Sequence, residues 1–227
     1  MGLAVSDTGN FEFTERTTMR RQANRAVFDH ATAYAILDEG LICHLGFAVD
    51  GRPFVVPTMH WRDGDRLYVH GSSASRTLRA LEGGSAEACV TVTLLDGLVL
   101  ARSAYHHSLN FRSVMVFGRA ALVEGPEKLH ALARLVEHVA PGRWDEVRHP
   151  SELELKATSV LALPLDEVSI KVSPGDPVDD EDDYDLPVWA GVVPLALRAG
   201  APDVDPLMRL DIATPSYLEH YTRLPER

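Results

Sequence analysis

Cysteine and long apolar runs are both scarce in this sequence of 227 residues. Its two cysteines, Cys43 and Cys89, stand inside apolar, strand-like stretches, where we expect buried, reduced thiols. No apolar run approaches the ~20 residues that a membrane-spanning helix needs, and the polar N-terminal segment lacks the apolar core of a signal peptide. These absences predict a cytoplasmic protein with no membrane partner.

Positive charge is also in short supply. The formal net charge of −11 argues against a nucleic-acid partner on electrostatic grounds, although an acidic surface is compatible with one local basic pocket. Hydrophobic residues make up 45% of the chain and charged residues 24%, as in an ordinary globular protein. The length suits one domain with a substantial core.

Several catalytic motifs are missing as well. The sequence has no G-x-S-x-G, no Walker loop and no G-x-G-x-x-G after a strand, which weakens the hydrolase, P-loop and Rossmann interpretations. C-x-x-C and H-E-x-x-H are absent too, and the adjacent His106 and His107 would point to opposite faces of a strand. We therefore expect no metal site of this kind.

Short strands dominate what is present. The pairs Asp50-Gly51 and Asp96-Gly97 predict two hairpin turns, and a polar excursion over residues 105–112 separates two later strands. Expected strands cover residues 41–49, 52–61, 67–69, 88–95, 98–104, 114–123 and 159–172, and expected helices cover residues 29–39, the stretch from residue 76 to Gly83-Gly84, and 126–139. This pattern, mainly β with a few helices (α+β), favours a barrel.

The organisation along the chain has three parts. We expect a flexible N-terminal segment over residues 1–20, a barrel domain over 21–173, and a C-terminal extension over 174–227 that packs on the barrel or on a dimer partner. The extension opens with an acidic run at 176–185, which is most simply a solvated surface loop. A docking surface is the alternative role for that run.

The stretch from residue 54 to 81, FVVPTMHWRDGDRLYVHGSSASRTLRAL, is the most informative. Pro57 inside a strand run indicates an edge or irregular position, where free backbone groups could pair with a flat polar ring. Ser72 and Ser75 precede a helix, and Arg76 opens it, so hydroxyls and a guanidinium meet where an anion could bind.

A dianionic phosphate needs several donors that converge, with arginine to neutralise it. Arg112 and Ser113, from a later strand, complete the set of phosphate candidates together with Ser72, Ser75 and Arg76. The alternative is a plain helix cap and two surface arginines.

The chain resembles the pyridoxamine 5′-phosphate oxidase-like family of flavin-binding split β-barrels, nearest the branch with nitroimidazole-resistance proteins. The resemblance rests on VVPTMHW, LYVHGSSASRTL, LVLARSAYHHSLNFRSVMVFGRA and DLPVWAGVVPL, and it covers roughly residues 20 to 195. It implies an FMN-binding split β-barrel that acts as a homodimer with cofactor sites between subunits. Relatives often carry lysine at the Arg76 position, so arginine keeps the charge.

The resemblance also implies roles for single residues. The strand with Pro57, Thr58, Met59 and His60 would line the flavin through its main chain, or would be an ordinary barrel strand. His70 matches a histidine near the flavin of the nitroimidazole-resistance relatives, where it would bind the cofactor or donate a proton, or else would be structural. Further candidates for the flavin pocket are Ser103, Asn110 and one of the two adjacent histidines; Trp189 would cover the ring across a dimer interface or pack in the core.

These features together predict an FMN-dependent oxidoreductase that acts on an unidentified small molecule with an unknown electron donor. True pyridoxamine-phosphate oxidase activity is not expected, because the C-terminal basic motif of those enzymes is replaced here by Trp189-Ala-Gly-Val-Val-Pro. The alternatives are reduction of nitro compounds, use of the deazaflavin F420 or of haem by the same scaffold, and a non-catalytic flavin carrier.

Overall fold

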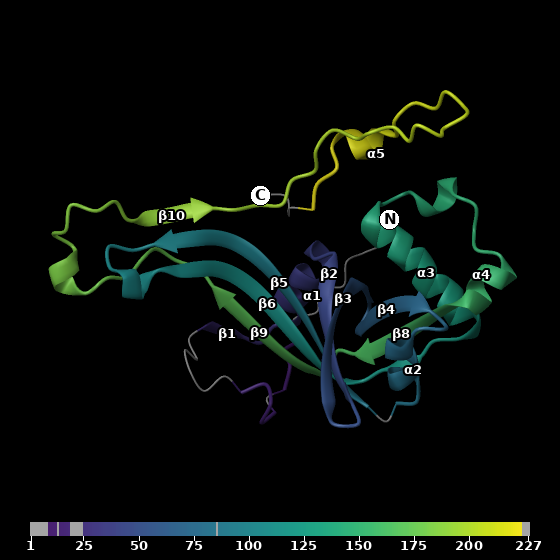
Figure 1. Ribbon diagram of the computed structural model, residues 1–227, viewed down its shortest axis with the longest axis horizontal. Coiled ribbons are helices and arrows are strands. Elements are labelled where there is room, and N and C mark those ends of the chain that lie inside the picture. The colour runs from purple at the N-terminus through teal and green to yellow at the C-terminus, as the bar shows by residue number, and fades with distance from the viewer. Residues whose placement is uncertain (1–8, 13, 19–24, 85, 224–227) are drawn as a thin grey trace.

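The computed structural model describes residues 9–12, 14–18, 25–84 and 86–223, and β-structure dominates them (Figure 1). Ten strands form one sheet in the order β1-β9-β6-β5-β2-β3-β4-β8-β7, with β10 paired to β5. The strands are β1 (Ala26–Val27), β2 (Ile42–Val49), β3 (Arg52–Asp63), β4 (Arg66–Ser72), β5 (Glu87–Leu100), β6 (Ser108–Arg119), β7 (Ala121–Leu122), β8 (Thr158–Pro164), β9 (Glu167–Ser173) and β10 (Gly191–Pro194). The helices are α1 (His30–Glu39), α2 (Arg76–Glu82), α3 (Gly125–Val139), α4 (Glu152–Ala157) and α5 (Ser216–Glu219), with short 3-10 turns η2 (Ala104–His106), η3 (Trp144–Glu146) and η4 (Glu181–Asp183).

Helix α1 begins and ends where the sequence predicts. The Asp29 side chain accepts a hydrogen bond from the Thr32 amide at 2.7 Å and caps the first turn. At the other end the Gly40 amide donates to the Ile36 carbonyl. A Cβ at Gly40 would lie 2.6 Å from Val92 Cγ1, so glycine lets the helix end close against β5.

Strand β3 changes partner half-way along its length. The predicted turn at Asp50 and Gly51 is confirmed, with both residues at positive φ, and it pairs residues 52–59 with β2. Residues 60–63 pair instead with β4. Within the described residues, the second edge of β3 therefore has no strand partner over 52–59, which confirms the edge position predicted from Pro57.

The hairpin turn predicted at Asp96-Gly97 is wrong, because β5 runs straight through this pair with a bulge between Leu95 and Gly97. Glycine is needed here for close approach: its Cβ would meet Val192 Cγ1 and the Val193 carbonyl oxygen of β10, each at 3.1 Å. The chain reverses at η2 instead, and β6 takes up the second half of the predicted polar excursion.

The single strand predicted over 159–172 is also wrong. Two strands, β8 and β9, occupy this stretch, and they pair with different neighbours, β4 and β6. Sequence reasoning also overlooked α4, although Ser151 and Glu154 form a complete capping box at its start.

The core has two parts. The larger lies between α1 and the sheet, and the smaller packs Trp61, Tyr68 and Val160 of the sheet against Ala131 and Leu132 of α3. Cys43 is buried, Cys89 is half-buried and both are free thiols. Across the part of the chain that the structure describes, no helix has the length and apolar character to cross a bilayer.

Both ends of the described chain pack on this body. Residues 1–8, 13, 19 and 20 of the segment predicted to be flexible lie outside the described residues, whereas Phe11 is buried and Arg16 pairs with Glu87 and Glu167. After β10 the chain has no helix or strand before α5, and Arg223 donates to main-chain carbonyls at the ends of α1 and α3. Figure 1 shows this C-terminal segment running above the sheet from β10 to α5.

Candidate functional site

A cavity of about 320 Å³ lies beside His70, bounded by β4, α3 and the connection that runs from η3 through α4. Most of its wall is apolar or aromatic. The lining residues are His70, Leu132, Leu135, Val136, Trp144, Val147, Arg148, Pro150, Glu154 and Thr158. A concave, mainly apolar cavity with a few polar groups is the usual form of a small-molecule site.

The imidazole of His70 packs against an aromatic ring, and one of its nitrogens lacks a hydrogen bond. Its residue pairs with Val160 of β8, and its ring meets Trp61 edge-on with 5.7 Å between the ring centroids. Nδ1 is buried and has no hydrogen-bond partner among the described residues. Burial lowers the pKa of His70 below its usual value, so the ring is neutral at pH 7 and keeps a lone pair for a ligand.

The sequence patterns predict no element over residues 143–158, which form the rim of this cavity. Trp144 stacks on His149 at 4.4 Å, and Arg148 forms a two-pronged ion pair with Glu154, with N–O distances of 2.7 and 2.9 Å. The signal that could have found this segment is the capping box that Ser151 and Glu154 form at the start of α4.

The predicted phosphate loop lies between β4 and α2. Ser72 is exposed, its Oγ accepts from the Ala74 amide at 3.2 Å, and its carbonyl accepts from the Ser75 amide at 2.8 Å. The Ser75 side chain does not cap α2. Arg76 is exposed and makes no ion pair with the described residues, so its guanidinium is available to an anion.

The ring-binding candidates of β3 divide into two kinds. Pro57, Thr58 and Met59 lie on the stretch with one open edge, and they are exposed or half-buried. His60 lies beyond it, paired with Val69 of β4. Its side chain is fully buried and Nε2 lies 3.0 Å from the Leu37 carbonyl oxygen, which places it in the core.

Arg112 and Ser113 lie on β6, far along the sheet from β4. Arg112 forms ion pairs with Glu39 of α1 and Asp96 of β5, both at 2.7 Å. Ser113 pairs with Thr93 and with Lys171 of β9. No hydrogen bond or ion pair in the described chain links either residue to the loop before α2, so one chain does not bring the predicted phosphate set together.

Of the candidates at the tip of the β5–β6 hairpin, Asn110, His106 and His107 line a second, polar cavity of about 290 Å³, and Ser103 is not among its lining residues. Asn110 Nδ2 donates to the Gly175 carbonyl, and the buried Ser103 Oγ has no partner among the described residues. His106 Nε2 is 3.5 Å from an Asp180 carboxylate oxygen but makes no hydrogen bond, while His107 lies in the same wall. The described residues hold no group of three His, Cys, Asp or Glu side chains arranged for a metal ion.

Part of the acidic run is structural. Asp179 is buried and accepts hydrogen bonds from the amides of Arg102 and Ser103, at 3.0 to 3.2 Å, which ties the run to the hairpin tip. Burial opposes the charge, but these hydrogen bonds and the Arg102 guanidinium hold the pKa of Asp179 below its usual value.

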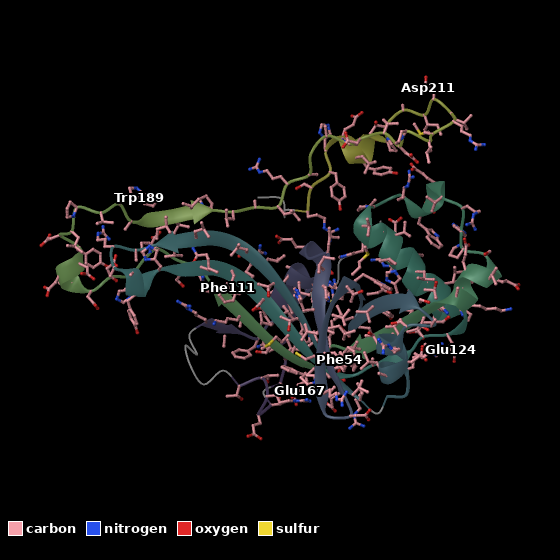
Figure 2. All side chains as sticks on the ribbon, in the orientation of Figure 1. Phe54, Phe111, Glu124, Glu167, Trp189 and Asp211 are labelled. Atoms are coloured by element: carbon pink, nitrogen blue, oxygen red, sulfur yellow. The ribbon has the colours of Figure 1, made fainter. Side chains whose placement is uncertain are left out.

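Trp189 is 66% exposed, and its ring lies against Gly191, where a Cβ would approach within 2.9 Å. Figure 2 places it near β10, whereas α2, α3 and α4 lie toward the opposite end of the molecule in Figure 1. The predicted site residues therefore do not form one cluster, because His70 and Arg76 lie on β4 and α2 and Trp189 lies near β10, on the opposite side of the molecule.

The sequence over residues 29–172 matches the family model described as pyridoxamine 5′-phosphate oxidase. The chain belongs to this family. The resemblance and the fold expected from the sequence are both confirmed, since structural relatives share the mainly antiparallel split barrel. A comparison with curated proteins finds no match.

Two solved structures resemble the chain over most of its length. The flavocytochrome Anf3 from Azotobacter vinelandii is 43% identical, with 92% of this chain and 97% of that chain covered and a TM-score of 0.86. The FAD and haem binding protein from Mycobacterium smegmatis is 36% identical, with 86% and 96% covered and a TM-score of 0.83. A structure from Bacteroides thetaiotaomicron, assigned as a 5-nitroimidazole antibiotic resistance protein, is 24% identical over 65% of this chain and 86% of that chain, with a TM-score of 0.55, and supports the fold alone.

Proposed function

We propose that this protein is a flavocytochrome-like redox protein that binds one flavin nucleotide and one haem. The proposal is supported by the similarity, over 92% and 86% of this chain, to one protein named a flavocytochrome and another named for FAD and haem. Such cofactors supply electron-transfer chemistry that side chains cannot. As expected from the sequence, the substrate would be a small molecule, and the electron donor is still to be identified.

His70 carries the haem assignment. His70 lines the cavity, and its burial keeps the ring in the neutral form, which is the form that ligates iron. The cavity beside it has apolar walls from Leu132, Leu135 and Val136, which suit a hydrophobic macrocycle. The cavity of about 320 Å³ is smaller than a tetrapyrrole but opens widely to solvent, so the ring would enter it by one edge and leave its other edge at the rim.

The test is replacement of His70 by alanine. The wild-type protein should show haem absorption bands, and His70→Ala should lose at least about 90% of its bound haem, because it removes the imidazole that would hold the iron, while it keeps its flavin. His130→Ala is the matched control, since His130 lies on α3, is exposed and bonds to Asp63 outside the cavity. Unchanged haem content in His70→Ala would assign the haem to another site.

The flavin is assigned to the loop before α2 and to the open edge of β3. Ser72, Ser75 and Arg76 supply donors for its phosphate. The edge of β3 that faces away from β2 has no strand partner among the described residues near Thr58 and Met59, and it supplies backbone groups for a polar ring edge. The family resemblance favours FMN, and the name of the M. smegmatis protein favours FAD. The nucleotide released on denaturation decides between them.

Two copies of the chain complete the flavin site. Phe111, the residue between Asn110 and Arg112 on β6, and Trp189 lie on the side of the molecule away from α2, which begins at Arg76 (Figures 1 and 2). These residues therefore do not join Arg76 within one chain. A homodimer that covers the open edge of β3 would bring a second copy of these residues to it.

A further inference from the structure

Arg148 is the only permanently charged cation among the residues that line the His70 cavity. It stands at the rim: its side chain is 71% exposed, and that of its partner Glu154 is 50% exposed. The opposite wall, from α3, is apolar. The cavity thus has a neutral imidazole and hydrocarbon inside and the Arg148–Glu154 ion pair at its mouth. A ligand that fits it has an apolar body and an anionic end that can take the place of the Glu154 carboxylate.

The ion pair between Arg148 and Glu154 can give way to an ion pair between Arg148 and a ligand carboxylate. An exposed ion pair contributes little net free energy, so a ligand carboxylate can replace Glu154 at small cost. Glu154 would keep hydrogen-bond partners after this replacement, because its carboxylate also accepts from the amide and hydroxyl of Ser151 at 2.7 and 2.9 Å. Arginine also presents two parallel donors, which match a carboxylate in geometry.

We infer that Arg148 recognises a carboxylate of the ligand in the His70 cavity and takes it in place of Glu154. The inference rests on the proposed function, and under that function the ligand is a haem, whose two propionates are its only anionic groups. Arg148 is then a specificity-determining residue that distinguishes tetrapyrrole acids from apolar rings of the same size.

The experiment compares haemin with haemin dimethyl ester, in which both carboxylates are blocked. Full-length protein purified without haem is titrated with each compound, and binding is followed by absorption. Arg148→Ala should weaken haemin binding by about 5-fold or more and leave the ester unchanged, since the lost contact is made only to carboxylate. Arg143→Ala is the matched control, because Arg143 is on the same segment but bonds to Glu146 and Tyr217 away from the cavity.

Glu154→Gln provides the opposite test. Glutamine can still accept from the Ser151 amide and preserve the capping box, but it releases the Arg148 guanidinium. It should therefore tighten haemin binding by about 2- to 5-fold, with no effect on the ester.

The outcomes separate the two proposals. If the wild type binds neither compound, the haem function fails and Arg148 loses its role with it. If the wild type binds haemin through His70 but both compounds respond equally to Arg148→Ala and to Glu154→Gln, the haem function stands and the inference about Arg148 is overturned.

Discussion

Two histidines on neighbouring strands, His60 and His70, illustrate how surroundings decide the role of a residue. His60 is fully buried, and its Nε2 lies 3.0 Å from the Leu37 carbonyl oxygen, so it is built into the core. Nδ1 is buried without a partner among the described residues in both histidines, but His70 also lines a cavity. The first histidine serves stability, and we assign the second to ligand binding.

His60 predicts a pH dependence of stability. Burial lowers the pKa of His60 to about 4, and the Leu37 carbonyl, which raises it, does not offset this. The unfolded chain takes up this proton near pH 6.5. The folded state is therefore favoured above pH 6.5, and this contribution is lost as the pH falls from 6.5 to about 4.

The measurement is urea denaturation of wild type and His60→Gln between pH 7 and pH 4. Wild type should lose up to about 3 kcal/mol of unfolding free energy from this group. The variant should be less stable at pH 7 but lose less on acidification, and His149→Gln, at an exposed histidine, should follow wild type. If the unfolding free energies of wild type and His60→Gln fall by the same amount between pH 7 and pH 4, the burial of His60 does not cause the pH dependence.

Residue patterns predicted the placement of the edge at Pro57 but not the burial of His60. Alternation in a strand implies that one of two adjacent side chains faces solvent. In β3 the strand passes from one set of partners to another at this point, and both His60 and Trp61 are fully buried. Only the three-dimensional path of the strand reveals this.

At the scale of elements, local signals worked where the local chemistry was decisive. Asp29 and Gly40 fixed α1, and Asp50-Gly51 fixed the β2–β3 hairpin. The same type of signal at Asp96-Gly97 failed, because glycine there serves the approach of β10, a strand nearly a hundred residues later in the sequence. The sequence did not predict the His70 cavity for a similar reason: α3, α4 and β4 are separate in the sequence and surround one cavity only in the folded chain.

The start of α2 gives a prediction about the binding of the flavin phosphate. Arg76→Ala should weaken FMN or FAD binding by roughly 10- to 150-fold, the equivalent of about 1.5–3 kcal/mol for a charge-assisted contact. Riboflavin, which lacks phosphate, should bind the variant as it binds wild type. Arg66→Ala is a suitable control on β4, because Arg66 is paired with Glu127 of α3, away from this loop. Equal losses for riboflavin and its nucleotides would show that Arg76 supports the fold.

At the scale of the whole molecule, the exposed apolar surface points to a second copy. Val55 on the open edge of β3 is 67% exposed, and Ile42, Phe54, Leu109 and Met115 on the same sheet are also exposed. Apolar side chains gathered on one sheet usually mark an interface, and dimers are the commonest closed assembly.

Light scattering should therefore give about twice the chain mass of 24.9 kDa at micromolar concentration. Val55→Glu should shift the protein toward the monomer and release flavin, because it places a charge on the open edge and separates the two halves of the site. Leu153→Glu, at an equally exposed apolar residue on α4, should remain dimeric. A stable monomer of the wild type that retains its flavin would contradict the dimer.

The proposed function requires that one protein carries both a flavin and a haem. The most direct measurement is the absorption spectrum of the purified full-length protein, followed by identification of the groups released on denaturation. We predict flavin bands and a haem Soret band in one species, with one flavin nucleotide and one haem per chain. A protein that carries flavin but takes up no haem, even when haemin is supplied, would contradict the central claim.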